Sequence, residues 1–263
     1  MQSEMQRVVI ERDGPIAIVR LNRPDVLNAI DLAMWQALLG AFEGLRDERD
    51  VRVCLITGNG RGFCSGADLK ETAWKGETAE QSKIRIDTHH QQLARAIVGL
   101  PVPVIACVNG YALGGGLEIA LAADIRIASR EAKFGFPEAA IGRFITGGAS
   151  LLLQRAIGPS RAKLLLYTSD HIAADEALSI GLVDEVVEPH DLFERAKAIA
   201  ARIAGNPPHS VQMMKRMLDE ISLSNFEDVL AKETEALVAT YGYSDIENAA
   251  RAFTNRRPQS QKE

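Results

Sequence analysis

One stretch of the sequence, Pro103 to Asp124, places a buried strand, a glycine-rich turn and a buried helix directly one after another. The run 104–108 is wholly apolar, as in a strand that is covered on both faces. Three glycines at 114–116 then lead into a second apolar run that begins a helix, and one carboxylate, Glu118, follows two residues later. Glycines let a backbone approach a ligand closely, and a helix N-terminus offers unpaired N–H groups. The stretch therefore predicts a place that stabilises negative charge, with an acid or base beside it.

The rest of the chain has the pattern of a layered α/β protein that ends in helices only. We expect strands at 7–13, 16–21, 51–57, 104–108, 124–129 and 182–187, the first two forming a hairpin. We expect helices after the capping residue Asp31 and at 81–98, 117–123, 151–157, 161–167 and 173–179. From residue 192 onward the pattern is helical, at 192–204, 211–221, 226–241 and 245–255.

Composition narrows the class of protein. The 263 residues suffice for one large domain, or for a domain with an appendage. A net charge of −5 argues against a general nucleic-acid binder, and no apolar run is long enough to span a bilayer. The N-terminus lacks the apolar core of a signal peptide, and the three cysteines show no metal-ligand spacing. We therefore expect a cytoplasmic protein with no metal site, no nucleic-acid partner and no membrane partner.

Two further patterns are weaker indications of a site. The glycines of loop 58–62 follow a strand, but the third is misplaced for a dinucleotide-binding loop and no long helix follows at once, so we reject that interpretation. Neither a Ser/His/Asp order nor a metal-ligand spacing supports the other candidates, which are Cys64, Asp68, His89 and His90. We interpret the pair His89-His90, on a polar helix, as a surface or interface feature.

Five segments in order along nearly the whole chain resemble motifs of the enoyl-CoA hydratase/isomerase (crotonase) superfamily. They are residues 23–29, 63–70, 109–118, 134–138 and, near the C-terminus, 252–257. The resemblance implies a crotonase-like α/β fold, in which a spiral of ββα units over 1–205 forms the catalytic core and 206–263 form a helical oligomerisation region. It also implies an acyl-CoA substrate, a homotrimer or homohexamer, and no cofactor, since coenzyme A is part of the substrate.

The resemblance also assigns roles to individual residues. The backbone N–H groups of Ala67 and Gly115 would bind the thioester carbonyl oxygen, where addition of water places negative charge. Glu118 would activate water for attack on Cβ, and Glu138 would protonate Cα. The other positions implied to contact the acyl-CoA are Leu27, Ser65, Asp68, Leu69, Lys70, Gly114 and Thr146.

Each assigned residue also has a plainer interpretation. A glycine triplet can be no more than a tight turn. Glu118 can point to solvent or pair with an arginine, although an unpaired buried carboxylate is costly. Acidic loop residues such as Glu138 are common, and a single cation such as Lys70 is at least as often a solvated charge. The ordered series of motifs favours the site over these interpretations.

The sequence departs from the family pattern in the loop 143–150. Ile145-Thr146 stand where the family usually has Pro-Gly, and Arg143 and Phe144 add charge and bulk. The acyl pocket is therefore expected to differ from that of a short-chain fatty-acyl hydratase. The predicted reaction is reversible addition of water to a 2-enoyl-CoA, which gives a 3-hydroxyacyl-CoA. Two alternatives stay open: an enoyl-CoA isomerase or hydratase-lyase acting on a non-standard acyl-CoA, and a non-catalytic acyl-CoA- or RNA-binding relative.

Overall fold

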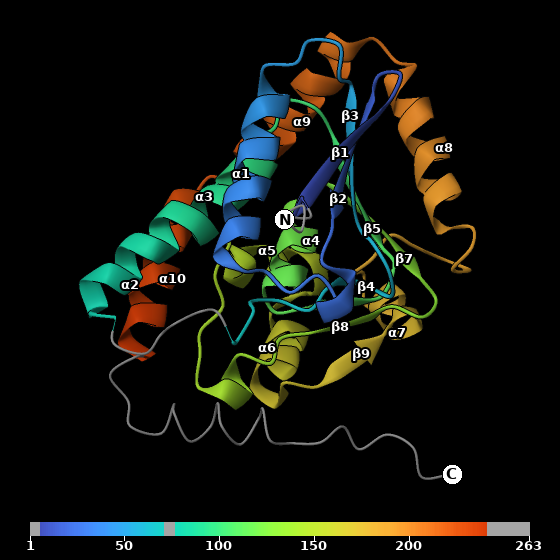
Figure 1. The fold of residues 1–263 in the computed structure, drawn as a ribbon. Coiled ribbons are helices and arrows are strands. Elements are labelled where there is room, and N and C mark those ends of the chain that lie inside the picture. Colours follow the sequence, from blue (N-terminus) through green and yellow to red (C-terminus); the bar gives the residue numbers. More distant parts are fainter. Residues whose placement is uncertain (1–5, 71–76, 241–263) are drawn as a thin grey trace, which may run out of the picture.

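The structure, a computed structural model, describes residues 6–70 and 77–240. The chain forms two β-sheets with helices packed around them (Figure 1). The strands are β1 Val8–Asp13, β2 Ile16–Leu21, β3 Val53–Gly58, β4 Gly62–Cys64, β5 Val104–Val108, β6 Tyr111–Leu113, β7 Ile125–Ser129, β8 Lys133–Gly135, β9 His171–Ala173 and β10 Glu185–Val187. The α-helices are α1 Leu32–Arg46, α2 Ala79–Arg85, α3 Gln92–Val98, α4 Gly115–Ala122, α5 Ala149–Ile157, α6 Pro159–Thr168, α7 Ala174–Ser179, α8 Leu192–Ala204, α9 Pro208–Ser222 and α10 Phe226–Thr240.

The larger sheet has the order β1-β2-β3-β5-β7-β10, and its inner strands β3 and β5 are buried on both faces. Its first two strands form the predicted antiparallel hairpin, and the remaining neighbours are parallel. Successive side chains of β3 alternate between two apolar clusters: Cys54 and Ile56 join one, Val53 and Leu55 the other. This alternation is the period of two that a strand imposes, so a sheet covered by helices on both sides needs apolar residues at every position.

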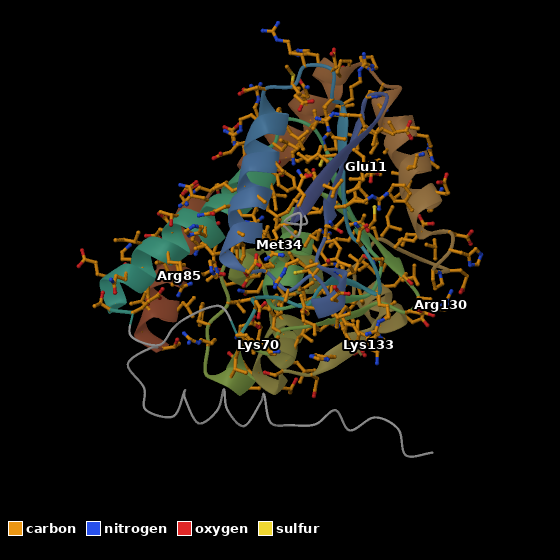
Figure 2. All side chains as sticks on the ribbon, in the orientation of Figure 1. Glu11, Met34, Lys70, Arg85, Arg130 and Lys133 are labelled. Carbon is orange, nitrogen blue, oxygen red and sulfur yellow. The ribbon has the colours of Figure 1, made fainter. Side chains whose placement is uncertain are left out.

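Helices cover the two faces of this sheet unequally (Figure 1). On one face, α1, α3 and α4 supply buried residues to the larger cluster, and Figure 2 shows Met34 of α1 in this interior. On the other face, α8 buries residues 192, 196, 200 and 204, a spacing of four that lines one side of a helix. The observed bounds of α8 equal the predicted ones. The predicted cap of α1 is also present, because Asp31 accepts a hydrogen bond from the Met34 N–H.

The smaller sheet has the order β4-β6-β8-β9, and its strands have three residues each. Each of β3, β5 and β7 in the large sheet is followed at once by a short strand of the small sheet. This repeated pairing, with helices after it, is the spiral of ββα units, so the fold prediction is confirmed. The short strands themselves were not predicted, because three residues show no alternation against the background of a loop.

The helix predicted over 81–98 has an irregular middle. A π-helical turn, Ile86–Gln91, lies between α2 and α3. A π turn accommodates one additional residue, and such turns are often found at functional sites. The side chains at its end therefore face a different direction from that given by a regular helical period. One of them, Gln91, is buried.

The C-terminal helices differ in how they meet the rest of the chain. None of the residues of α9 is buried. In contrast, α10 returns to the core, where Phe226 and Leu230 pack against Ala94 of α3. The predicted helices 211–221 and 226–241 correspond to α9 and α10, whereas 245–255 and the motif 252–257 lie outside the described residues. The division into a catalytic core, 1–205, and an oligomerisation region, 206–263, stays a prediction.

Candidate active site

Two loops meet at the centre of the site because β4 and β6 are parallel neighbours. The loop that leaves β4 contains Gly66, and the turn that leaves β6 leads into α4. Gly66 has a φ of +91°, and a Cβ there would lie 2.7 Å from the Leu113 carbonyl oxygen and 3.4 Å from the Gly115 nitrogen. A Cβ on Gly116 would collide with the carbonyl oxygen of Cys64. Glycine at both positions therefore lets the two backbones touch.

The predicted oxyanion donors lie on these two loops. Gly115 is the first residue of α4, so its N–H has no acceptor within the helix. On the other loop, the Ile30 N–H donates to Gly66 (2.8 Å) and the Asp68 N–H donates to Ile30 (2.9 Å), in a parallel bridge that pairs Ile30 with Ala67. In such a bridge the N–H of Ala67 points away from Ile30. Ala67 and Gly115 both line one pocket.

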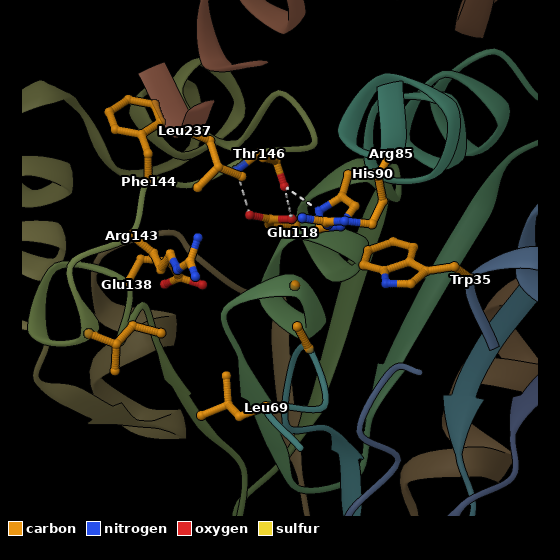
Figure 3. A pocket seen from close by; sticks show the side chains of 13 residues that line it. Trp35, Leu69, Arg85, His90, Glu118, Glu138, Arg143, Phe144, Thr146 and Leu237 are labelled. Atoms are coloured by element: carbon orange, nitrogen blue, oxygen red, sulfur yellow. Dashed lines mark hydrogen bonds between the residues drawn. The ribbon is translucent and has the colours of Figure 1, made fainter. Parts of the chain in front are cut away.

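The first carboxylate of this pocket is Glu118, in the first turn of α4. Its side chain is buried, and it accepts two hydrogen bonds from Thr146: 2.6 Å from the backbone N–H and 2.8 Å from the hydroxyl (Figure 3). Burial raises the pKa of Glu118 to about 7, and the two bonds from Thr146 oppose that rise. Glu118 is thus a carboxylate that changes charge near neutral pH and is stabilised in its ionised form by two donors.

The second carboxylate, Glu138, enters from the segment after β8 and lines the same pocket. It lies against the turn before α4, because a Cβ on Gly114 would collide with it. Its Oε2 atom is buried and has no hydrogen-bond partner among the described residues. Burial, and then the charge of Glu118, raise the pKa of Glu138 to about 8. Burial therefore raises the pKa of both carboxyl groups towards neutral pH, where a carboxyl group can serve as a base or as an acid.

The pocket holds about 550 Å³ of space, part of it open to solvent. Apolar side chains from several elements line it, among them Trp35 of α1 and Leu237 of α10 (Figure 3). Two guanidinium groups, Arg85 and Arg143, line it as well. Three residues of the 143–150 loop, Arg143, Phe144 and Thr146, line the pocket, and the expected difference of the acyl pocket stays a prediction. The lining residues are Trp35, Ala67, Leu69, Arg85, His90, Gly115, Glu118, Glu138, Ile141, Arg143, Phe144, Thr146 and Leu237.

The interpretation of His90 as a surface or interface feature was wrong. Its ring stacks on Trp35, with centroids 4.4 Å apart and planes 19° from parallel, and its Nδ1 lies 3.2 Å from the Thr146 hydroxyl. The error arose because His90 lies in the π turn, which turns it toward the pocket. No residue pattern in the sequence predicts such a turn. The neighbouring His89 instead has its Nδ1 3.0 Å from the Arg85 carbonyl oxygen of its own helix.

Sequence reasoning also missed other pocket residues, among them Trp35, Arg85 and Leu237. Trp35 was assigned only to the apolar face of its helix, and nothing in the sequence shows that one edge of its ring reaches a cavity. Arg85 and Leu237 come from helices that approach the pocket only through tertiary packing. Cys64, in contrast, is excluded as a nucleophile at neutral pH, because burial raises the pKa of its thiol to about 12.

Several predicted coenzyme A contacts lie together beside the pocket. Leu27 has a left-handed backbone, with φ +53°, and its carbonyl accepts a hydrogen bond of 3.0 Å from the Ser65 N–H. Asp68 accepts a hydrogen bond from Arg23 (3.0 Å) and another from the backbone N–H of Lys70 (3.1 Å). These contacts give Asp68 and Leu27 a role in shaping the loop. Leu69 lines the pocket itself, and the contact of all these residues with a substrate stays a prediction.

The described residues include no helix that is both long and apolar enough to cross a membrane. Within the same ranges, no group of three or more His, Cys, Asp or Glu side chains is arranged to hold a metal ion.

Comparison with known proteins identifies the family. The sequence profile described as enoyl-CoA hydratase/isomerase matches residues 11–263. The chain is 38% identical to a short-chain-enoyl-CoA hydratase of Clostridium acetobutylicum, over 97% of each chain, and 34% identical to a crotonyl-CoA hydratase of Syntrophomonas wolfei, over 96% of each. The crystal structure of an enoyl-CoA hydratase from Mycobacterium avium subsp. paratuberculosis superimposes with a TM-score of 0.86 at 30% identity, covering 98% of this chain and 99% of that one. The chain therefore belongs to the enoyl-CoA hydratase/isomerase family.

Proposed function

We propose that the protein is an enoyl-CoA hydratase that adds water reversibly to a 2-enoyl-CoA and releases a 3-hydroxyacyl-CoA. One observation supports this most directly: two buried carboxylates, Glu118 and Glu138, line one pocket together with the backbone of Ala67 and Gly115. Hydration needs a base for water, an acid for Cα and a stabilised thioester oxygen, and this pocket offers a candidate for each. The two relatives described above match nearly the full length of the chain, and both are named as hydratases.

The N–H groups of Ala67 and Gly115 serve as the oxyanion hole. Attack of water at Cβ moves an electron pair through Cα toward the thioester carbonyl, so that oxygen becomes negative. Fixed donors that meet this charge stabilise the transition state more than the ground state, by about 3 kcal/mol for a single donor. The N-terminal position of Gly115 on α4 adds the positive end of the helix dipole.

Glu118 serves as the base and Glu138 as the acid. Two hydrogen bonds from Thr146 favour the ionised form of Glu118, whereas burial and the charge of Glu118 raise the pKa of Glu138 and favour its protonated form. During hydration the water oxygen bonds to Cβ, its proton passes to Glu118, and the proton of Glu138 passes to Cα. After this step Glu118 carries a proton and Glu138 has lost one. A water molecule between the two side chains then returns the proton from Glu118 to Glu138 for the next turnover.

The pocket also supports a second candidate within the same chemistry, a hydratase for an acyl group other than a short straight chain. Arg143 and Phe144 line the pocket in the loop that departs from the family pattern. They place charge and an aromatic ring where the acyl group enters. A non-catalytic acyl-CoA- or RNA-binding relative has less support, because buried carboxylates without a task are costly to a fold. An isomerase has less support as well, because it needs one proton carrier and the pocket holds two.

The assembly and setting that we propose are a homotrimer or a homohexamer in the cytoplasm, with coenzyme A entering only as part of the substrate. Support for the assembly comes from α9, which leaves an apolar stripe exposed on the single chain. An exposed apolar face of this kind marks an interaction site. The stripe consists of Met213, Met214, Met217, Leu218 and Ile221.

A panel of enoyl-CoA thioesters tests the proposed reaction. Hydration removes the conjugated thioester absorbance, which can be followed directly. We expect crotonyl-CoA or a longer or substituted enoyl-CoA to be hydrated, and Glu118→Gln and Glu138→Gln each to lower kcat by about 10²- to 10⁴-fold. Glu131→Gln, at an exposed surface position, is the matched control and retains activity. Full activity in Glu118→Gln, or no turnover of any thioester by the wild type, would refute the proposal.

A further inference from the structure

Three polar groups in the pocket form a chain with a defined direction (Figure 3). A carboxylate can only accept, so the Thr146 hydroxyl donates its one hydrogen to Glu118 Oε2 at 2.8 Å. The hydroxyl oxygen must then accept from its other partner, His90 Nδ1, at 3.2 Å. His90 therefore carries its hydrogen on Nδ1. The order of donation is His90 to Thr146 to Glu118.

The first member of this chain is held firmly in place. The π turn directs His90 to the pocket, and stacking on Trp35 fixes the plane of its ring. Burial lowers the pKa of His90 to about 3, so its charge does not change over the range in which Glu118 titrates. The Thr146 backbone is tied to Glu118 as well, through its own N–H. The donors are thus fixed toward one carboxylate, with the Thr146 N–H on Oε1 and the Thr146 hydroxyl on Oε2.

We propose that Thr146 and His90 are positioning residues that keep Glu118 ionised and oriented for the hydration step. This inference depends on the proposed role of Glu118 as the base. Threonine stands where the family pattern usually has glycine, so its hydroxyl is an additional donor that the backbone alone does not supply. His90 strengthens that donor, because a hydroxyl that accepts a hydrogen bond donates a stronger one.

Other charged groups face Glu118 from every side of the pocket. Glu138 follows β8, Glu233 lies on α10, Arg85 on α2 and Arg143 in the loop before α5. All four stay in place when only a hydroxyl or an imidazole is replaced. A change in the pH dependence of the Thr146 and His90 variants therefore reports the lost donor, since the charges of these four groups are unchanged.

The test is the pH profile of kcat/KM for hydration of crotonyl-CoA, whose acidic limb reports the base of the free enzyme. Thr146→Val removes the hydroxyl and keeps the shape, and we expect its acidic limb to move up by about one pH unit, the effect of losing one hydrogen bond to a charged group. The acidic limb of the variant then lies closer to the alkaline limb, which reports Glu138, so the bell-shaped pH profile also becomes narrower. Thr146→Ser keeps a hydroxyl and is expected to restore the wild-type limb.

A second pair of variants tests His90 without touching the threonine. His90→Phe keeps an aromatic ring to stack on Trp35 but has no donor, whereas His90→Asn places an amide N–H near the position of Nδ1. We expect His90→Phe to shift the acidic limb upward by less than Thr146→Val does, and His90→Asn to reverse most of that shift. In the double variant Thr146→Val/His90→Phe, no shift beyond that of Thr146→Val is expected, because the two residues act through one bond.

His89→Asn is the matched control, because His89 bonds to its own helix, and its acidic limb is expected to match the wild type. The inference is overturned if the folded Thr146→Val and His90→Phe enzymes both have the wild-type acidic limb. If Thr146→Val does not fold, the His90 pair alone decides. Failure of the proposed function has a different signature: Glu118→Gln would then keep its activity, or the wild type would hydrate no enoyl-CoA.

Discussion

Replacing Glu138 by glutamine is predicted to inactivate the enzyme and, at alkaline pH, to stabilise it. The carboxylate sits where burial and the charge of Glu118 raise its pKa from 4.5 to about 8. In the unfolded chain both influences vanish. The folded state therefore holds the proton more tightly than the unfolded state, and the stability of the wild type falls as pH rises from about 4.5 to about 8. Below that window the residue is protonated in both states, and above it the loss is complete.

The size of the effect follows from the same shift. A rise of the pKa from 4.5 to about 8 corresponds to about 5 kcal/mol, at about 1.4 kcal/mol per pKa unit. Glutamine has the shape of the protonated acid and cannot ionise, so Glu138→Gln avoids this cost. For a chain of this length, 1 kcal/mol moves the Tm by about 2–4 °C. We therefore expect the variant to melt up to about 10–20 °C above the wild type at pH 9, and close to it at pH 5.

Thermal melts followed by circular dichroism from pH 5 to pH 9, at one fixed protein concentration, measure this difference. Glu131→Gln serves as the control, because this exposed glutamate has no such environment, and its Tm should follow the wild type throughout. The reasoning is refuted if the difference between Glu138→Gln and wild type does not grow with pH. A wild type that is the more stable protein at pH 9 would refute it as well.

Three other perturbations have distinct expected outcomes. Gly116→Ala places a methyl group against the Cys64 carbonyl oxygen and is expected to abolish soluble expression, whereas Gly115→Ala meets only ordinary contacts, the nearest at 3.6 Å, and should express and melt like the wild type. Glu233→Ala leaves the buried Gly148 N–H without its acceptor, so we expect urea denaturation to show a loss of about 1–3 kcal/mol, and kcat to fall. Met217→Glu puts charge into the apolar stripe of α9 and should lower the molar mass found by light scattering; an unchanged mass would argue against that interface.

Long elements with a clear period were predictable from the sequence alone. The amphipathic spacing of four in α8 predicted the bounds of that helix, and the capping residue Asp31 predicted where α1 begins. The β1–β2 hairpin followed from two β-like runs around a Gly-Pro turn. In each case a local physical preference and the tertiary structure agree, which makes the local signal sufficient.

The parts that could not be predicted are those that depend on contacts far along the chain. A three-residue strand such as β4 exists only because β6 lies beside it. The π turn that directs His90 to the pocket has no residue signature, and the approach of Leu237 depends on how α10 folds back. The carboxylates themselves were placed by the family resemblance. Thr146 was placed beside them by the same resemblance, whereas its two hydrogen bonds to Glu118 became visible only in three dimensions.

The attachment of α10 to the core affects the order in which the parts of the protein fold. Gln91 Nε2 donates to the Leu230 carbonyl at 2.9 Å, and its Oε1 accepts from the Gly147 N–H at 3.0 Å, so this one side chain joins the tail helix to the loop that holds Glu118. Contacts over such sequence separations cost loop-closure entropy, which slows their formation. A nascent chain can complete its sheets before α10 has been synthesised, yet it gains a finished pocket only afterwards. In refolding experiments, hydratase activity should therefore return after the sheet signal and together with the docking of α10.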